Sequence, residues 1–554
     1  MTAFIIHNMA PIMFAALVVF LLLGYPAAFS LGAVGLIFGL IGIELGQFSP
    51  DFLQALPERV YGVMNNDTLL AIPFFTFMGL VLERSGMAED LLDTIGQLFG
   101  TVRGGLAYAV VFVGALLAAT TGVVAASVIS MGLISLPIML RYGYDRRVAC
   151  GVIAASGTLA QIIPPSLVLI VMADQLGKSV GDMYEGAFIP GMVLSALYAS
   201  YVFLVSMIFP KATPGLPPEA VGFREDGGGR GLTSLAVLTV ASGLFGWLAM
   251  RGATSRGADY VVLTMFFGII FAFAVAVVNW LSNRFFGFRF LSHIAQQTTF
   301  VMVPPLFLIF LVLGTIFIGV ATPTEGGAMG ASGALILGAM KRRLTWELVR
   351  QAVESTAKLS AFVLFILVGA RVFSLTFYGV SGHIWVEEML VSLPGGQIGF
   401  LLFVNAFVFI LAFFLDFFEL AFIVIPLLGP AAERIGIDLI WFGVILGVNM
   451  QTSFMHPPFG FALFYLRSVA PRESYLDRIT GKRMDAVTTG QIYWGAVPFV
   501  FIQIIMVVLV IMFPGMVMHY KGVASTIDPS KVRIEIPQID MPPTLDLSEP
   551  PKFN

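Results

Sequence analysis

The sequence predicts an all-α polytopic membrane protein, and three observations support this fold class. Apolar residues make up 58% of the 554 residues, far above the share that is usual in soluble domains. Charged residues make up only 11% of the chain. The mean hydropathy is +0.93 over the whole length, so one membrane anchor does not account for the apolar excess. Most of the protein is therefore expected to lie in a lipid bilayer.

The first apolar stretch, 10–23, is interpreted as an uncleaved membrane span. No Lys or Arg precedes Arg59, so the positive region that begins a cleaved signal peptide is absent. A helix needs ~20 apolar residues to cross ~30 Å of hydrocarbon, and several of the later segments are shorter than that. Sixteen apolar segments of helical character lie near 10–23, 27–43, 68–82, 105–119, 123–140, 148–173, 184–208, 232–250, 260–281, 299–319, 325–340, 359–378, 398–415, 420–437, 439–466 and 490–513.

The positive charges divide unequally between the two sides of the membrane. If the segments alternate from an outside N-terminus, twenty of the 30 Lys and Arg residues fall on one side. The positive-inside rule makes that side cytoplasmic. Both termini are then expected on the outer side, and the proline-containing tail 521–554 is expected to be disordered.

Two apolar segments, 148–173 and 439–466, are interrupted by tandem prolines. Pro164 and Pro165 follow a run of small and hydroxyl residues in the first, and Pro457 and Pro458 follow a similar run in the second. Proline removes an amide donor and clashes with the carbonyl four residues back, so both helices should unwind at membrane depth. Unwound backbone there must be buried in protein or line a polar cavity. A kink in a buried helix is the alternative interpretation.

A pair of short apolar limbs precedes each broken helix. The first pair, 105–140, turns at Thr120-Thr121-Gly122, and the second, 398–437, turns at Asp416-Phe417-Phe418-Glu419. Limbs of ~15 residues reach only ~22 Å as helices, so re-entrant hairpins are expected, one entering from each side. The topology makes the two copies antiparallel. Inverted repeats with interrupted helices indicate a secondary transporter with its site near the midplane.

The sequence carries none of the motifs that indicate an enzyme. It contains no HExxH or CxxC motif, and Gly177-Lys178-Ser179 lacks the first glycine of a phosphate-binding loop. The single cysteine, Cys150, excludes disulfides within the chain and thiolate metal sites. The five histidines are scattered, and a net charge of −3 does not favour nucleic-acid binding. No enzymatic activity and no nucleic-acid partner are expected.

Several motifs in order resemble the large membrane subunit of tripartite ATP-independent periplasmic (TRAP) transporters. The resemblance covers about residues 10–515 and rests on Ala154–Ser166, Gly319–Ala328, the Asp416 hairpin with Pro426, and Gly443–Gly460. It implies an elevator-type secondary transporter of bacterial inner membranes, with periplasmic termini in the topology above. Sodium entry would drive uptake of organic acids that a periplasmic solute-binding protein delivers. A small four-helix membrane subunit would be the third component, and sodium the coupling ion, with no organic cofactor.

The resemblance also implies which residues form the binding sites. The sodium ligands would come from Thr120, Thr121, Gly122, Ser156, Gly157, Asp416, Thr452 and Ser453. The substrate would contact Ser156, Thr158, Asp416 and Gln451. His456, which departs from the family pattern, is a further candidate for substrate contact. Hydroxyls in membrane helices also bond their own backbone carbonyls, which is the alternative for the threonines.

Three ionisable groups lie within apolar segments and need an explanation, because a charge at membrane depth costs several kcal/mol unless it is paired or hydrated. Asp416 is expected beside a sodium ion or in a wet cavity, or else at the mouth of its hairpin. Arg371 is expected to form a structural ion pair, with Glu325 as a possible partner, and direct substrate binding is the alternative. His456 stands where the family often has a small or apolar residue, so it either contacts substrate or is a hydrogen-bonded buried histidine.

The chain divides into six regions on this basis. Residues 224–298 hold an extra helix pair that shorter family members lack, and longer members are linked with keto acids. The regions are scaffold helices 1–67, a first repeat 68–223, the extra pair 224–298, connecting helices 299–358, a second repeat 359–520 and the tail 521–554.

Two other functions compete with a tripartite uptake system. A stand-alone sodium/dicarboxylate carrier has a similar architecture and needs no binding protein. An intramembrane enzyme or a scaffold is a second alternative, but an enzyme should show clustered catalytic groups and a scaffold does not need paired helix breaks.

Overall fold

The computed structural model describes residues 2–222, 225, 229, 231–252, 258–477 and 479–519. The tail 521–554 lies outside the described residues. Eight helices in this part of the chain are long and apolar enough to cross a membrane, and two bent helix pairs add up to two more spans. The fold is therefore a polytopic helical membrane protein, as the composition predicts.

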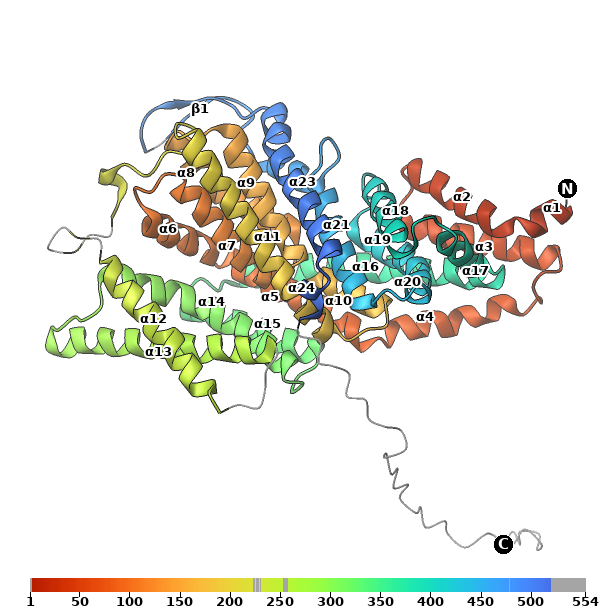
Figure 1. Ribbon diagram of the computed structural model, residues 1–554, viewed down its shortest axis with the longest axis horizontal. Helices are drawn as coiled ribbons and strands as arrows, with labels where there is room; N and C mark the ends of the chain where they lie inside the picture. Colours follow the sequence, from red (N-terminus) through yellow and green to blue (C-terminus); the bar gives the residue numbers. More distant parts are fainter. Residues whose placement is uncertain are drawn as a thin grey trace, which may run out of the picture.

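The N-terminal region packs against the long central helix α16 (Trp346–Gly379). Gly35 in α3 and Gly369 in α16 leave room for this contact, since a Cβ at Gly369 would lie 2.4 Å from the Ala28 carbonyl oxygen. The elements of this region are α1 (Thr2–His7), α2 (Met9–Leu22), α3 (Ala27–Glu44), η1 (Phe52–Ala55), α4 (Leu56–Met64), η2 (Asp67–Leu70), α5 (Ala71–Arg84) and α6 (Met87–Phe99). Figure 1 shows α1 to α4 at one end of the molecule, α5 near its centre and α6 at the opposite end.

The first half contains a helical hairpin followed by a broken helix. Helices α7 (Gly105–Thr121) and α8 (Val124–Arg141) are the limbs of the hairpin. Helix α9 (Arg146–Thr158) continues into η3 (Leu159–Gln161), and α10 (Leu167–Gln175) begins after Pro164 and Pro165. The prolines lie in the gap, where the helix was predicted to break. Helix α11 (Val180–Ile208) and η4 (Pro218–Ala220) complete this half.

The second half repeats this order with a differently shaped hairpin. Its outer limb is α18 (Gly396–Leu411), which is bent by 119° against α17 (Gly382–Val391), and its inner limb is split into α19 (Phe417–Ile423) and α20 (Ile425–Arg434). Helix α21 (Leu439–Ser453) stops before Pro457 and Pro458, and α22 (Phe461–Val469) follows them. Both Pro-Pro bonds are cis.

The described part of residues 224–298 contains an extra helix pair, which lies beside α14. Figure 1 shows α12 (Leu232–Met250) and α13 (Ala258–Phe286) together along one edge of the molecule. Glycines allow their backbones to approach closely, because a Cβ at Gly246 would lie 2.1 Å from the Thr264 carbonyl oxygen. The fully buried Asn279 accepts hydrogen bonds from the amides of Phe290 and Leu291 and fixes the turn into α14.

The remaining elements connect the repeats and close the chain. Helix α16 runs without a break across the 358/359 boundary between the regions predicted from the sequence. A two-stranded hairpin, in which Tyr475 faces Met484, was not predicted, because strands of two residues show no periodicity. These elements are α14 (His293–Phe317), α15 (Pro323–Met340), β1 (Tyr475–Leu476), β2 (Arg483–Met484), α23 (Thr489–Met512) and α24 (Gly515–Met518).

Candidate transport site

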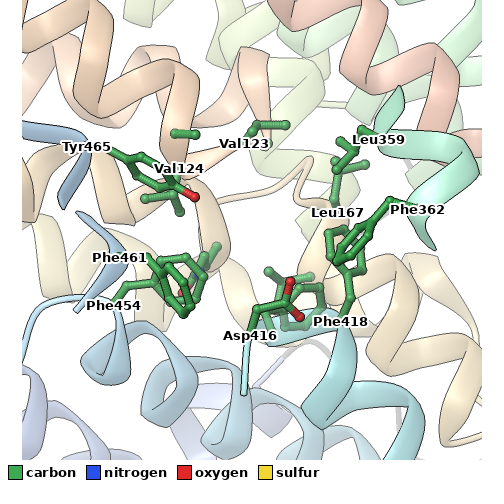
Figure 2. A pocket seen from close by; sticks show the side chains of 15 residues that line it. Val123, Val124, Leu167, Leu359, Phe362, Asp416, Phe418, Phe454, Phe461 and Tyr465 are labelled. Atoms are coloured by element: carbon green, nitrogen blue, oxygen red, sulfur yellow. The ribbon is translucent and has the colours of Figure 1, made fainter. Parts of the chain in front are cut away.

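A cavity of about 330 Å³ lies where the two hairpin tips and the two broken helices meet. Both halves of the chain and α16 contribute to its wall. Figure 2 shows Asp416 with its carboxylate directed into the space, Phe418 and Phe362 on one side, and Phe454, Phe461 and Tyr465 on the other. The lining residues are Gly122, Val123, Val124, Ala125, Gln161, Leu167, Val168, Leu359, Phe362, Asp416, Phe417, Phe418, Phe454, Phe461 and Tyr465.

Asp416 is held in the cavity by a capping box at the start of α19. Its Oδ1 accepts a hydrogen bond from the Glu419 amide at 2.9 Å, and the Glu419 carboxylate accepts one from the Asp416 amide at 2.9 Å. The partial positive charge of a helix N-terminus stabilises a carboxylate in this place. Asp416 is half-buried and is the only charged side chain among the lining residues that the structure describes.

Two further polar side chains line the cavity, and neither was predicted as a site residue. The Gln161 side chain comes from η3, and its buried Oε1 has no hydrogen-bond partner within the described residues. Tyr465 comes from α22. Gln161 could have been predicted as a site residue from its position three residues before Pro164, because side chains beside a helix break face the unwound backbone.

The tip of the first hairpin contributes backbone atoms, and not a charged side chain, to the cavity wall. Gly122 adopts a left-handed conformation with φ +59°, which favours glycine, and lies against Leu167. The side chains of Thr120 and Thr121 lie outside the described part of the structure.

Ser156 and Gly157 pack into the first hairpin and do not line the cavity. A Cβ at Gly157 would lie 2.4 Å from Cγ2 of Val128 in α8, and one at Gly114 in α7 would lie 2.5 Å from the Ser156 Cβ. The Ser156 hydroxyl is fully buried and has no partner among the described residues. The Ser156 side chain therefore lies against the middle of α7.

Thr452, Ser453 and His456 lie at the second helix break, behind the cavity wall. Thr452 donates to the Val448 carbonyl oxygen at 3.3 Å, and the Ser453 hydroxyl donates to the Met450 carbonyl oxygen. The His456 Nδ1 lies 2.6 Å from the Ser453 carbonyl oxygen, and its ring packs on Phe413. These contacts correspond to the hydrogen-bonded buried histidine that was one of the two expectations.

Thr158 and Gln451 contact each other across the two helix breaks. The Gln451 amide nitrogen donates to the Thr158 hydroxyl at 3.2 Å, and both side chains are fully buried. Neither lines the cavity. Tyr198 of α11 and Gln503 of α23 join them, and neither was predicted as a site residue.

The predicted ion pair between Glu325 and Arg371 is wrong. Among the ion pairs of the described residues none joins the two. Glu325 instead forms a capping box at the start of α15, where its carboxylate accepts from the Thr322 amide at 2.8 Å. The spacing Thr322-x-x-Glu325 before an apolar run is the signal for such a cap.

A polytopic helical protein whose two inverted hairpins and two broken helices enclose a charged cavity belongs, as a class, with the membrane transporters. Over residues 14–516 the chain matches the family described as "Tripartite ATP-independent periplasmic transporter, DctM component". The chain belongs to this family and is a large permease subunit of a TRAP transporter. Members of the family are transporters rather than enzymes.

The names of three similar permeases refer to three different substrates. The C4-dicarboxylate TRAP transporter large permease protein DctM of Pseudomonas aeruginosa is 28% identical over 83% of this chain and 88% of its own length. The isethionate permease protein DctMQ of Oleidesulfovibrio alaskensis is 24% identical over 83% of this chain and 60% of its own. The sialic acid permease protein SiaT of Haemophilus influenzae is 23% identical over 84% of this chain and 61% of its own.

Proposed function

We propose that this permease couples sodium entry to the uptake of an organic acid, and that both bind at the cavity between the hairpin tips. One observation carries the proposal. The cavity wall holds the carboxylate of Asp416 and, among the described lining residues, no Lys or Arg. A carboxylate substrate would meet repulsion there, and a sodium ion between the two negative groups would convert it into attraction.

Sodium is also suited to the other groups at this place. Hard cations are bound by oxygen atoms of carboxylates, hydroxyls and carbonyls. Asp416 offers the carboxylate oxygen that does not cap α19, and Gln161 offers a carbonyl oxygen without a partner among the described residues. The Ser156 hydroxyl, which packs against α7, is proposed to join them in a sodium-loaded state. Thr120 and Thr121 on the first hairpin, and Thr452 and Ser453 on the second broken helix, are proposed to supply further oxygen atoms in a sodium-loaded state.

The substrate is proposed to be a carboxylate, with C4-dicarboxylates and keto acids as the first candidates. Aromatic side chains cover much of the wall and suit the apolar part of a small organic acid. Membership of the family implies two partners, a small membrane subunit and a periplasmic binding protein. We propose that the small subunit has four helices, that the complex lies in the bacterial inner membrane with both termini periplasmic, and that the two hairpins and broken helices move together as an elevator.

Reconstitution into proteoliposomes tests the proposal. Uptake of a radiolabelled dicarboxylate should require the permease, its small subunit, the loaded binding protein and an inward sodium gradient. A sodium ionophore that collapses the gradient is the matched control and should stop uptake. Full uptake by the permease alone would favour the stand-alone carrier, and uptake that persists without sodium would overturn the coupling.

A further inference from the structure

Arg371 lies at membrane depth in the long helix α16 without a partner for its charge. Its side chain is partly exposed and forms no hydrogen bond or ion pair with any residue that the structure describes. It lies eight residues before the end of the helix at Gly379, which is ~12 Å along the axis. A charge at this depth is costly unless it is paired or hydrated. The guanidinium therefore needs an anion that the described chain does not supply.

This anion is not a substrate in the hairpin cavity, because Arg371 faces away from that cavity. Leu359 and Phe362 are the residues of α16 that line it. Arg371 follows Phe362 by nine residues, which is about two and a half helical turns and puts it on the opposite side of α16.

A second cavity, of about 250 Å³, lies on the face of α16 that carries Arg371. Leu364 and Val368 line this cavity, and they precede Arg371 by seven and three residues, the spacing that keeps side chains on one helix face. The other wall comes from the end of α4, from η2 and from the start of α5. The unpaired charge and the cavity are therefore neighbours along one stripe of α16.

The lining of the second cavity is apolar. Among the lining residues that the structure describes, only Asn66 and Ser360 are polar, and the Asn66 amide already donates to the Asp174 carboxylate at 2.8 Å. Apolar side chains around an empty space lose dispersion contacts, so this space favours an apolar occupant. Such a lining suits a hydrocarbon chain and not a soluble anion.

The second cavity is also open at the side and is elongated along α16. Met64, Leu70 and Leu364 line it and are exposed, so it opens on the surface of the fold between them. From Ser360 to Arg371 the helix rises ~16 Å, which is close to half of the ~30 Å hydrocarbon core, the depth of one leaflet. A chain lying in the cavity would thus run parallel to the lipids of that leaflet.

We propose that this face of α16 binds an anionic phospholipid, with the phosphate on Arg371 and part of one acyl chain in the second cavity. Arginine forms paired hydrogen bonds to phosphate oxygens, and its long side chain can extend toward the headgroups from this depth. The described lining residues include no carboxylate to hold the amine of a zwitterionic headgroup, so a net negative lipid fits best. The inference does not depend on the proposed sodium coupling.

Lipid titration of thermal stability tests this site in the delipidated full-length permease in detergent. Dioleoyl phosphatidylglycerol is the probe, and a ligand that binds only the native state raises the melting temperature with its concentration. In Arg371→Gln the lipid concentration for half of the stabilisation should rise by about tenfold or more, because the charged hydrogen bonds to phosphate are lost. Val368→Phe fills the second cavity and should shift the titration in the same direction.

The matched control is Arg251→Gln, which removes an arginine that stacks on Trp247 in the extra helix pair and should titrate like the parent. Phosphatidylcholine with the same chains should stabilise less than phosphatidylglycerol, and inorganic phosphate should not stabilise the parent. The proposal is wrong if Arg371→Gln and Val368→Phe titrate like the parent, or if either of the other two probes stabilises the parent as well as phosphatidylglycerol.

The small membrane subunit is the competing source of the anion. If Arg371→Gln loses this subunit during purification of the complex while its lipid titration stays parental, the anion is an acidic side chain of the subunit and the lipid site is wrong. Retention of the subunit together with a weakened lipid titration supports the lipid.

Discussion

The two hairpin tips that meet at the cavity are built from different residue types. The first turns through Gly122 in a left-handed conformation and presents backbone and small apolar side chains. The second begins its inner limb at Asp416, whose capping box with Glu419 places a carboxylate at the cavity. The fixed charge of the site therefore comes from the second half alone.

The two broken helices differ in the space around them. In α9, a Cβ at Gly151 would lie 2.1 Å from the Gly495 carbonyl oxygen, and one at Gly157 would lie 2.4 Å from Val128. In α21, a Cβ at Gly443 would lie 2.7 Å from the end of the flexible Met183 side chain, and one at Gly447 would meet its nearest neighbours only at 3.7 Å. The first broken helix is thus packed against the backbone of α23 and against Val128 of α8, while the second meets the end of a flexible side chain at Gly443 and has room at Gly447.

The largest effect is expected from Asp416→Asn, which removes the one charge of the cavity wall. Asparagine also caps helices, so α19 should still form. Uptake by the reconstituted system should fall to the background of empty liposomes, and sodium should stabilise the purified variant less. Glu387→Gln is the control, because Glu387 pairs with Arg434 away from the cavity. Parental uptake by Asp416→Asn would show that the second tip is not the charged site.

The next largest effect is expected from Gly157→Ala. Its methyl group would overlap Val128, and overpacking of this kind costs ~1–3 kcal/mol. The same substitution at Gly447 meets only ordinary contacts and should leave stability unchanged or raise it by up to ~1 kcal/mol through helix propensity. Thermal unfolding of both variants measures the difference. Equal losses at the two positions would contradict the contrast between the broken helices.

A smaller effect is expected when the ion pair between the end of α8 and the loop after α22 is removed. Arg141 and Thr480 both donate to the Asp477 carboxylate, and these hydrogen bonds lower its pKa well below the usual value of ~3.9. A lowered folded-state pKa stabilises the protein above the unfolded-state value, and this contribution is lost as the pH falls through the folded-state value.

The parent should therefore melt at a higher temperature than Asp477→Asn at neutral pH, and the difference should shrink below about pH 4. Melting curves recorded over a pH series test this. Asp485→Asn removes an exposed partner of Arg146 and should change little. A difference between parent and Asp477→Asn that is the same at every pH would show that the charge of Asp477 is not its source.

The smallest effects are expected from single hydroxyl deletions at the two breaks. Thr452→Val removes a hydrogen bond to the Val448 carbonyl oxygen and should cost ~1 kcal/mol of stability in buffer in which choline replaces sodium. Ser156→Ala removes a hydroxyl without a partner among the described residues, so it should cost nothing in choline but should weaken stabilisation by sodium. Sodium-independent loss of stability in Ser156→Ala would remove Ser156 from the ion site.

The hairpins, the helix breaks and the position of Asp416 could be predicted because their signals are local. Tandem prolines and an acidic residue inside apolar segments stand out without knowledge of any distant contact. The roles of Gln161 and Tyr465 could not be predicted, because a polar side chain in an apolar helix does not reveal which helix it faces. The contact of Gly151 with Gly495 joins positions more than three hundred residues apart, and such pairings decide which side chains meet.

Two other errors have different causes. Glu325 was named as a possible partner of Arg371 across the fold, although the spacing from Thr322 indicated a helix cap. The amphipathic helix α6 was not among the predicted segments, because its charged face lowers the mean hydropathy on which the segments were selected.

Sodium coupling through the Asp416 cavity can be tested by measuring sodium flux. Proteoliposomes that contain the permease and its small subunit are supplied with radioactive sodium and substrate-loaded binding protein. Sodium should enter only when the loaded binding protein is present, in a fixed ratio to substrate, and Asp416→Asn should abolish both fluxes. Substrate entry without sodium entry, or substrate entry driven equally well by a proton gradient, would contradict the account.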